Sequence, residues 1–366
     1  MDIVLWKRKP FLQLMSLCSL CAIWLIACDS GAGTAHPVLS PVRNTASVST
    51  SESAPSPIPS PTSTVAASAT PQPLLQLTFV AELTSDVYGV YAVTLGCPDE
   101  VPPCLSEPEL LFNNSQLWRA STMSWSPDGK MLAFDSWGEG EKQDIFLVDW
   151  NGDNLVNITK SPIHEDYPKW SPDGNRISYN STTIETGQVF SVNPDGTDRV
   201  RLLSLADVNH PSYSSWSPDG KQLTFTGYDG AMHPAHVYAA NLDGSSLVQL
   251  THATLDSFTP GFSPDGSWIT FSRYIPVPNS FGDITPNVFL IRPDGSGEVW
   301  LVRDKESSKN FPTWSPWGDW IAFRSFKPME ESDLFIIKPD GTNLVNVTNT
   351  PGINEYQPAW RVVTVP

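Results

Sequence analysis

A ten-residue pattern recurs along the chain, and its spacing restricts the possible folds more than any other feature of the sequence. The copies are "WSPDGKMLAF" from Trp125, "WSPDGNRISY" from Trp170, "WSPDGKQLTF" from Trp216, "FSPDGSWITF" from Phe262 and "WSPWGDWIAF" from Trp314. Their first aromatics are separated by 45, 46, 46 and 52 residues, and Trp360 follows 46 residues after the last copy. Self-similarity at this period is typical of proteins built from repeated supersecondary units.

Each copy predicts two strands joined by a tight turn. Proline and aspartate favour the corners of such a turn, and glycine adopts the positive φ that other residues resist. A third strand is predicted about a dozen residues later, as in "DIFLV" from Asp144, and a fourth strand after a second glycine turn such as "PDGT" at 194–197. Four strands repeated at this spacing predict the blade of a β-propeller.

The two ends of the repeat region set the predicted number of blades at six. Residues 77–79, 90–93 and 108–112 match the second, third and fourth strands of a blade that lacks its innermost strand. Residues 356–363, "YQPAWRVV", match an innermost strand with no blade after it. We therefore expect an all-β, six-bladed propeller over residues 74–366, closed by the C-terminal strand, with the conserved aromatics packed between neighbouring blades.

The first 73 residues predict export and anchoring. Residues 1–27 carry three basic residues ahead of an apolar run, which is typical of a signal peptide, with a retained transmembrane helix as the alternative. "LIAC" at 25–28 resembles the lipobox of bacterial lipoproteins, which implies a lipid on Cys28. The remainder of 28–73 is rich in Ser, Thr and Pro and predicts a disordered linker. We expect a monomer anchored to a cell membrane on its extracytoplasmic face, in the periplasm or at the cell surface.

Cysteine usage and charge agree with an extracytoplasmic location. Cys97 and Cys104 are the two cysteines of the predicted propeller, and we expect a disulfide between them, with two free thiols as the alternative. The net charge is −17, and residues 74–366 hold 36 acidic against 18 basic residues. An acidic surface repels phosphate, so nucleic acid is not expected as a partner.

Candidate functional residues lie on the face where the predicted loops vary in length, because variable loops on a rigid scaffold commonly carry function. The expected contact residues for a partner are Asp166, Tyr167, Arg273, Tyr274, Lys309, Asn310, Glu355 and Tyr356. Five histidines also fall on this face and could hold a divalent ion such as manganese or zinc, or could be loop histidines of an exposed rim: His164, His210, His233, His236 and His252. Nucleophile-elbow, zinc-protease and nucleotide-binding motifs are missing from the sequence, so we expect no cofactor beyond that possible metal.

The repeat, followed by "D-I-F-x-V", "D-G-T-N" and "L-T", resembles the WD-like repeat of the TolB propeller family over roughly residues 75–363. The resemblance implies a periplasmic propeller that binds partner proteins, including a peptidoglycan-associated lipoprotein. Departures from TolB are the lipobox and the missing N-terminal α/β domain. The blades also resemble those of prolyl-oligopeptidase enzymes, whose hydrolase domain is not expected here because nothing follows Pro366.

Two hypotheses about function follow from these features. The first is a non-catalytic binding module for an envelope protein, peptide or glycan. The alternative is a metal-dependent enzyme similar to a polysaccharide lyase, because the blades also resemble oligogalacturonate lyase, in which histidines at the channel mouth hold a metal. In both cases a fold-level resemblance specifies the architecture more strongly than the activity.

The lipobox predicts the effect of one substitution. Cys28→Ser removes the sulfur that would carry the lipid, so the variant should leave the membrane fraction in a high-salt wash and incorporate no labelled fatty acid. Cys21→Ser, within the apolar leader, is the matched control and should behave as the wild type. Retention of the Cys28→Ser variant in washed membranes would contradict the predicted anchor.

Overall fold

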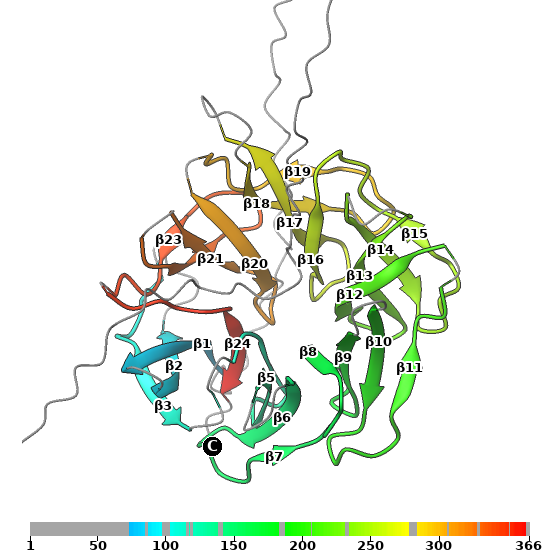
Figure 1. Ribbon diagram of the computed structural model, residues 1–366. Coiled ribbons are helices and arrows are strands. Elements are labelled where there is room, and N and C mark those ends of the chain that lie inside the picture. Colours follow the sequence, from blue (N-terminus) through cyan, green and yellow to red (C-terminus); the bar gives the residue numbers. More distant parts are fainter. Residues whose placement is uncertain are drawn as a thin grey trace, which may run out of the picture. The chain divides into compact units, whose positions relative to one another are not determined.

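The computed structural model describes residues 73–84, 87–96, 103–114, 117, 120–137, 142–182, 187–205, 207–230, 234–277, 284–305, 307–327, 330–350 and 352–363. Over these residues the chain forms six antiparallel sheets of four strands, arranged around a common axis (Figure 1). The predicted six-bladed propeller is therefore confirmed. No helix within these ranges is long and apolar enough to cross a membrane. The predicted leader, the linker and Cys28 lie outside the described residues.

Each blade places one strand next to the axis and three strands progressively further out. The innermost strands are β24 (Ala359–Val363), β4 (Met123–Trp125), β8 (His164–Trp170), β12 (Asn209–Trp216), β16 (Ser257–Phe262) and β20 (Ser308–Trp314). The second strands are β1 (Leu74–Thr84), β5 (Met131–Ser136), β9 (Ile177–Thr182), β13 (Gln222–Tyr228), β17 (Ile269–Pro276) and β21 (Ile321–Phe326). The third strands are β2 (Val87–Leu95), β6 (Asp144–Asp149), β10 (Gly187–Val192), β14 (His236–Asn241), β18 (Ile284–Ile291) and β22 (Asp333–Ile337).

The fourth strands are short and form the outer edge of each blade. They are β3 (Glu109–Asn113), β7 (Val156–Asn157), β11 (Val200–Leu202), β15 (Val248–Gln249), β19 (Val299–Trp300) and β23 (Val345–Asn346). Four of them have two residues each. Short edge strands present few unpaired backbone groups and so give little opportunity for pairing with another chain.

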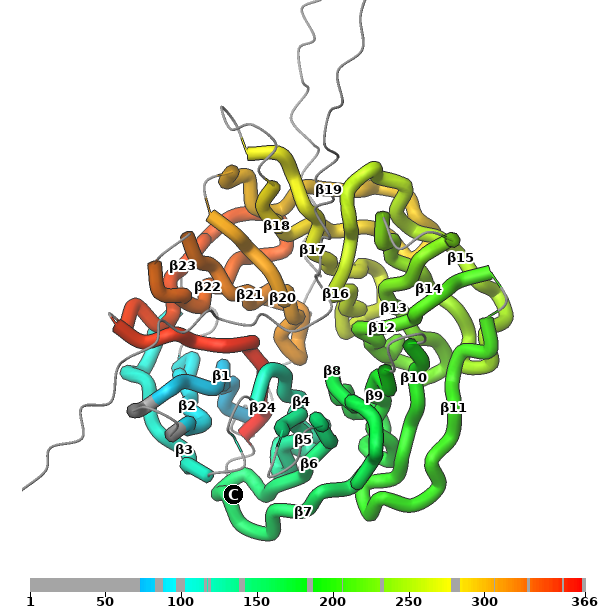
Figure 2. Tube along the Cα trace, in the orientation of Figure 1, coloured from blue at the N-terminus to red at the C-terminus, as the bar shows by residue number. Residues whose placement is uncertain are grey.

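The two ends of the repeat region meet in one sheet, as predicted. Strand β24 pairs antiparallel with β1, with Trp360 opposite Leu77, so the last strand of the chain completes the first blade (Figure 2). Arg361 secures this strand: its Nε donates to the Gly129 carbonyl at 2.9 Å, and its guanidinium lies 4.8 Å from the Trp125 ring centroid. The closing strand is therefore bonded to the second blade as well as to the first.

The conserved tryptophans join neighbouring blades. Trp216 Nε1 donates to the carbonyl of Lys169 at 3.2 Å, and Trp360 Nε1 donates to the carbonyl of Thr313 at 3.1 Å. In both cases the acceptor residue directly precedes the conserved aromatic of the previous blade. The indoles are nearly buried, so they supply apolar packing between the sheets together with one directional bond.

The Ser-Pro-Asp-Gly turns are held by their own side chains. In the turn after β4, Ser126 Oγ donates to Asp128 Oδ1 at 2.6 Å, and the same Asp128 oxygen accepts the Lys130 backbone N–H at 3.2 Å. These bonds, first the one from the Ser126 hydroxyl, hold the pKa of Asp128 below its usual range. The regular aspartates of this face therefore serve the turns.

Two loops add detail to the sequence-based description. The 52-residue interval of the repeat contains an extended hairpin, because β17 continues to Pro276 and pairs with β18 from Ile284 onward. Cys104 is disulfide-bonded, whereas Cys97 lies outside the described residues. The pairing of Cys97 with Cys104 stays a prediction.

The closing contact predicts a difference between two matched glycines. Gly129 and Gly220 occupy the same turn position with φ of 68°. A Cβ on Gly129 would lie 1.9 Å from the Val362 carbonyl oxygen of β24, whereas on Gly220 the nearest atom is 4.0 Å away. Both alanine variants incur about 1–2 kcal/mol for the left-handed backbone, and Gly129→Ala should lose about 1–3 kcal/mol more through overpacking.

Urea unfolding of the two variants measures this difference. The larger loss in Gly129→Ala should come with an unchanged m-value, because the surface exposed on unfolding stays the same. Equal free energies of unfolding for Gly129→Ala and Gly220→Ala would contradict the placement of β24.

Candidate functional site

Four innermost strands carry a strained residue at the same position, three residues before the conserved aromatic. Tyr167, Tyr213, Thr259 and Phe311 have φ between 52° and 55°, and the pairing of each strand with its neighbour shifts register next to them. A positive φ at a residue with a Cβ costs about 1–2 kcal/mol, and bulges of this kind commonly redirect a side chain. The strained residues of the four strands occupy equivalent positions around the axis. Because backbone strain concentrates at functional sites, these residues form a candidate site.

Two of these residues form an aromatic pair across neighbouring blades. The ring centroids of Tyr167 and Tyr213 lie 4.1 Å apart, and the Tyr167 hydroxyl donates to that of Tyr213 at 3.1 Å. Both side chains are only partly buried, although they belong to strands at the centre of the ring. Burial raises the pKa of Tyr167 well above its usual value, so the pair is neutral and available for stacking and hydrogen bonding.

Carboxylates occupy the axis beside this pair. Asp135 is buried and accepts the Thr122 backbone N–H at 2.6 Å and the Ser121 hydroxyl at 2.7 Å. Asp166 accepts only Asn180 Nδ2, at 3.1 Å, within the described residues. Burial, followed by repulsion from Asp135, raises the pKa of Asp166 to about 8. Asp166 therefore carries a proton at neutral pH and can donate a hydrogen bond.

The opposite side of the axis presents aromatic and cationic groups. The Arg324 guanidinium lies 5.4 Å from the Tyr356 ring centroid and 5.0 Å from that of Phe326. On the neighbouring strand β20, Asn310 Oδ1 is buried without a hydrogen-bond partner among the described residues. Together with the Tyr167–Tyr213 pair, these residues give the loop end of the axis a mixed polar and aromatic lining, which suits the recognition of another molecule.

The structure divides the predicted contact residues into two groups. Asp166, Tyr167, Tyr274, Asn310 and Tyr356 are partly exposed on or near the innermost strands. The other three, Arg273, Lys309 and Glu355, are 8%, 3% and 0% exposed.

Internal partners explain that burial. Arg273 NH2 donates to Glu298 at 2.9 Å, and its guanidinium lies 5.0 Å from the ring centroids of Phe271 and Phe289. Lys309 Nζ forms an ion pair with Asp304 at 2.7 Å. Glu355 accepts the Thr350 hydroxyl, and burial raises its pKa to about 7. These three side chains support the blades, so they are not available to a partner.

The predicted histidine cluster is dispersed among the described residues. His164 stacks edge-on against Trp137, His210 against Tyr228 and His236 against Tyr238, while His252 is exposed. His233 lies outside the described residues. Within the described part of the chain, no group of three or more His, Cys, Asp or Glu side chains is placed to hold a metal ion.

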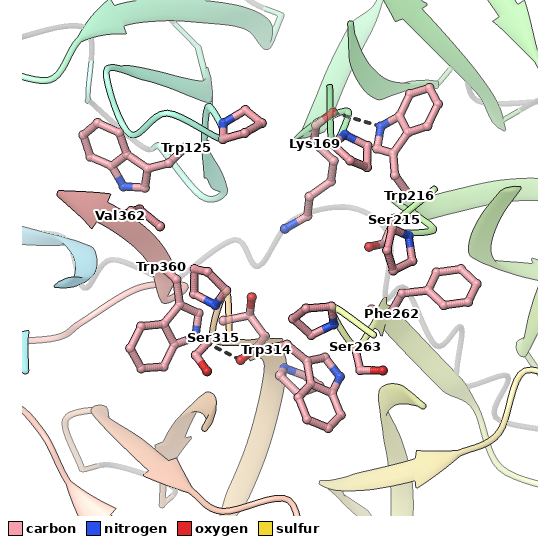
Figure 3. A pocket seen from close by; sticks show the side chains of 18 of the residues that line it. Trp125, Lys169, Ser215, Trp216, Phe262, Ser263, Trp314, Ser315, Trp360 and Val362 are labelled. Carbon is pink, nitrogen blue, oxygen red and sulfur yellow. Dashed lines mark hydrogen bonds between the residues drawn. The ribbon is translucent and has the colours of Figure 1, made fainter. Parts of the chain in front are cut away.

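A measurable cavity lies at the other end of the axis, where the Ser-Pro-Asp-Gly turns are. This turn-end cavity has a volume of about 460 Å³ and is lined by residues of all six blades, among them Pro127, Pro172, Pro218, Pro264 and Pro316. Lys169 extends into it, with its amine towards the middle of the ring (Figure 3). Burial lowers the pKa of Lys169 to about 8.

Sequence reasoning missed Lys169, Tyr213, Asp135 and Arg324. A signal for Lys169 is visible when the copies of the repeat are aligned, because other copies have a small neutral residue at that position. The same alignment gives a signal for Asp135 and Arg324, which occupy one repeat position where three other copies have the neutral residues Asn180, Thr226 and Ser272.

This architecture defines a class of protein. Its members are six-bladed propellers with turns of the Ser-Pro-Asp-Gly type and a ring closed by the C-terminal strand. The chain belongs to the TolB-like β-propeller family. The family model of the TolB beta propeller domain matches residues 115–280. An uncharacterised protein of Agrobacterium fabrum is 31% identical over 209 residues, which cover 56% of this chain and 69% of that protein.

Two further comparisons support the fold. An uncharacterised peptidase of Bacillus subtilis is 29% identical over 154 residues, which are 42% of this chain and 22% of the peptidase. The chain thus spans about a fifth of that protein's length. The crystal structure of TolB from Acinetobacter baumannii has a TM-score of 0.60 at 18% identity, with 79% of this chain and 66% of that one covered.

The protonated Asp166 predicts an altered pH dependence of stability. Its pKa is about 4 when unfolded and about 8 when folded. The folded state therefore holds a proton that the unfolded state releases, and this contribution to stability is lost as the pH rises through that window. Asp166→Asn cannot titrate, so it should lose less stability than the wild type between about pH 5 and about pH 8.

An exposed turn aspartate provides the control for this measurement. The Ser217 hydroxyl holds the pKa of Asp219 below its usual range, so Asp219→Asn should lower stability by a constant amount near neutral pH and change the slope of stability against pH only in more acidic solution. Urea unfolding at several pH values gives the slopes of stability against pH. The same slope for Asp166→Asn and the wild type would show that Asp166 is ionised in the folded protein.

Proposed function

We propose that the chain is a lipid-anchored, extracytoplasmic propeller that acts as a non-catalytic binding module for an envelope protein, peptide or glycan. The single observation that carries this proposal is the repeated strain at the innermost strands, which presents the Tyr167–Tyr213 pair at the axis. Backbone strain persists only where surrounding structure over-determines it, and it concentrates at binding sites and active sites.

The chemistry of the loop end supports binding rather than catalysis. Tyrosine offers a large, rigid contact area with a polar tip and is enriched where proteins recognise other molecules. Asp166, Asn310 and Tyr356 add a hydrogen-bond donor, an acceptor and a further ring around the same axis. The partly exposed residues therefore form a surface with both apolar and polar contacts and no described set of nucleophile, base and oxyanion donors.

Membership of the TolB-like family and the predicted lipobox support the location. A leader with three basic residues and the "LIAC" sequence at 25–28 are consistent with a protein held at the envelope. The acidic balance of the propeller makes a protein, peptide or glycan a better candidate than a polyanion.

A cross-linking pull-down from native envelope tests this function. Tyr167→Ala combined with Tyr213→Ala removes both rings from the axis, and because rigid aromatic anchors carry much of the free energy of binding, this variant should lose most of the partner captured by the wild type. Trp317→Ala is the matched control, since Trp317 is an aromatic residue, 39% exposed, in a turn of the opposite face.

Thermal melting of the purified variants accompanies the pull-down. Both variants should melt as cooperative folded proteins, and Trp317→Ala should capture the partner as the wild type does. Undiminished capture by a folded Tyr167→Ala/Tyr213→Ala variant would exclude the axis as the binding surface.

A further inference from the structure

One residue of the turn-end cavity departs from the repeat in both size and charge. The position directly before the conserved aromatic holds a small, uncharged residue in five blades: Ser124, Ser215, Gly261, Thr313 and Ala359. In the remaining blade it holds Lys169. The fold does not require a long cation here, because four of the other copies form the same turn without one.

The geometry directs this cation into the cavity. The backbone carbonyl of Lys169 accepts the Trp216 indole, which fixes the strand, while the side chain extends towards the centre of the ring (Figure 3). Among the described residues that line the cavity, Lys169 is the only one with a charged side chain. Its surroundings are proline rings, aromatic edges and serine or threonine residues.

The ammonium of Lys169 has no partner within the described part of the chain. No carboxylate or hydrogen-bond acceptor there contacts its Nζ, and burial is the only cause that shifts its pKa. Lys309 shows the contrasting case, because its buried ammonium is neutralised by Asp304 at 2.7 Å and by the Ser307 hydroxyl at 2.8 Å. A partly desolvated charge without a partner is unfavourable, and an anion from outside the chain would relieve that cost.

We propose that the turn-end cavity binds a small monocarboxylate with an apolar body, and that the Lys169 ammonium recognises the carboxylate. A single positive charge matches a single negative charge, and the cavity offers no second described cation for a dianion such as phosphate. The proline and aromatic walls accommodate the apolar body. The volume of about 460 Å³ lies within the range of small-molecule sites, roughly 300–1,000 Å³.

The same chemistry could come from a free organic acid or from the C-terminal end of a peptide. Both present one carboxylate attached to a compact, partly apolar group. The net charge of −17 disfavours polyanions near the propeller but has little effect on a monoanion that enters a desolvated site with its own cation. Neither Tyr167 nor Tyr213 is among the described residues that line this cavity, so failure of this proposal would leave the proposed partner-binding function unaffected.

Binding of four probes to the purified protein tests the proposal. The probes are sodium butyrate, N-acetyl-alanyl-alanine with a free carboxylate, the C-terminal amide of the same dipeptide, and inorganic phosphate. Isothermal titration at about pH 7 should give saturable binding of one or both carboxylates and none of the amide or phosphate. Butyrate alone would identify a free acid, and the dipeptide alone a chain end; either result supports the site.

Substitution of the lysine assigns the binding to Lys169. Lys169→Met should weaken binding of the carboxylate about tenfold or more, because a charge-assisted hydrogen bond is lost. Lys221→Met is the matched control, since Lys221 belongs to a turn of the same face and its side chain is 81% exposed. Affinity should also fall between about pH 7 and about pH 9.5 as Lys169 loses its proton.

A direct readout on the wild-type protein keeps the test valid if Lys169→Met fails to fold. The ¹³Cε resonance of Lys169, assigned by its loss in Lys169→Arg, should titrate at higher pH when the carboxylate is present, because a bound anion favours the charged form. Absence of carboxylate binding, equal affinity in Lys169→Met, equal binding of the amide, or binding of phosphate alone would overturn the proposal.

Discussion

The propeller depends on the packing of the repeated aromatics between neighbouring blades, and at two junctions a tryptophan indole adds a hydrogen bond to the carbonyl that precedes the aromatic of the previous blade. Trp216 and Trp360 make it directly. At the junction between the two chain ends, Trp125 Nε1 donates to Thr78 Oγ1 at 2.7 Å, and Thr78 donates to the Ala359 carbonyl at 2.8 Å. A threonine hydroxyl thus extends the same connection at the closing blade. Trp170 Nε1 and Trp314 Nε1 are buried without a hydrogen-bond partner among the described residues, so at those junctions packing alone joins the blades.

Much of this architecture could be predicted from the sequence because its causes are local. Turn residues, strand alternation and the repeat interval are written in consecutive letters, and the unmatched strands at 77–79 and 356–363 specify the closure. The candidate site was less predictable. The strain at Tyr167 and Tyr213 arises from a bulge that alternation does not reveal, and the burial of Lys309 depends on Asp304, which approaches from a loop. Sequence position alone did not distinguish the buried residues of the loop face from the exposed ones.

The aspartates of the repeated turns stabilise the fold and are not available to a ligand. In the conserved turns, a serine hydroxyl and a backbone N–H occupy the carboxylate, as at Asp128 and Asp219, and this lowers the pKa of both. These groups are ionised and internally bonded, so most of the regular negative charge of the turn face stabilises turns instead of forming a ligand site. Asp166 differs because burial beside Asp135 raises its pKa to about 8. The charge of this carboxylate is therefore set by burial and by a neighbouring acid, and not by a turn.

A comparison of equivalent positions in the six blades applies to both candidate sites. A propeller built from nearly identical units gives each position six equivalent environments, so a residue type that occurs in only one of them is not required by the fold. Lys169 satisfies this criterion at the turn end, and the Tyr167–Tyr213 pair satisfies it for two neighbouring blades at the loop end. Arg273 and Lys309 also depart from the repeat, but each forms an ion pair with a carboxylate of this chain, Glu298 or Asp304. A departure from the repeat that lacks such an internal partner is consequently the stronger indication of a molecule bound from outside.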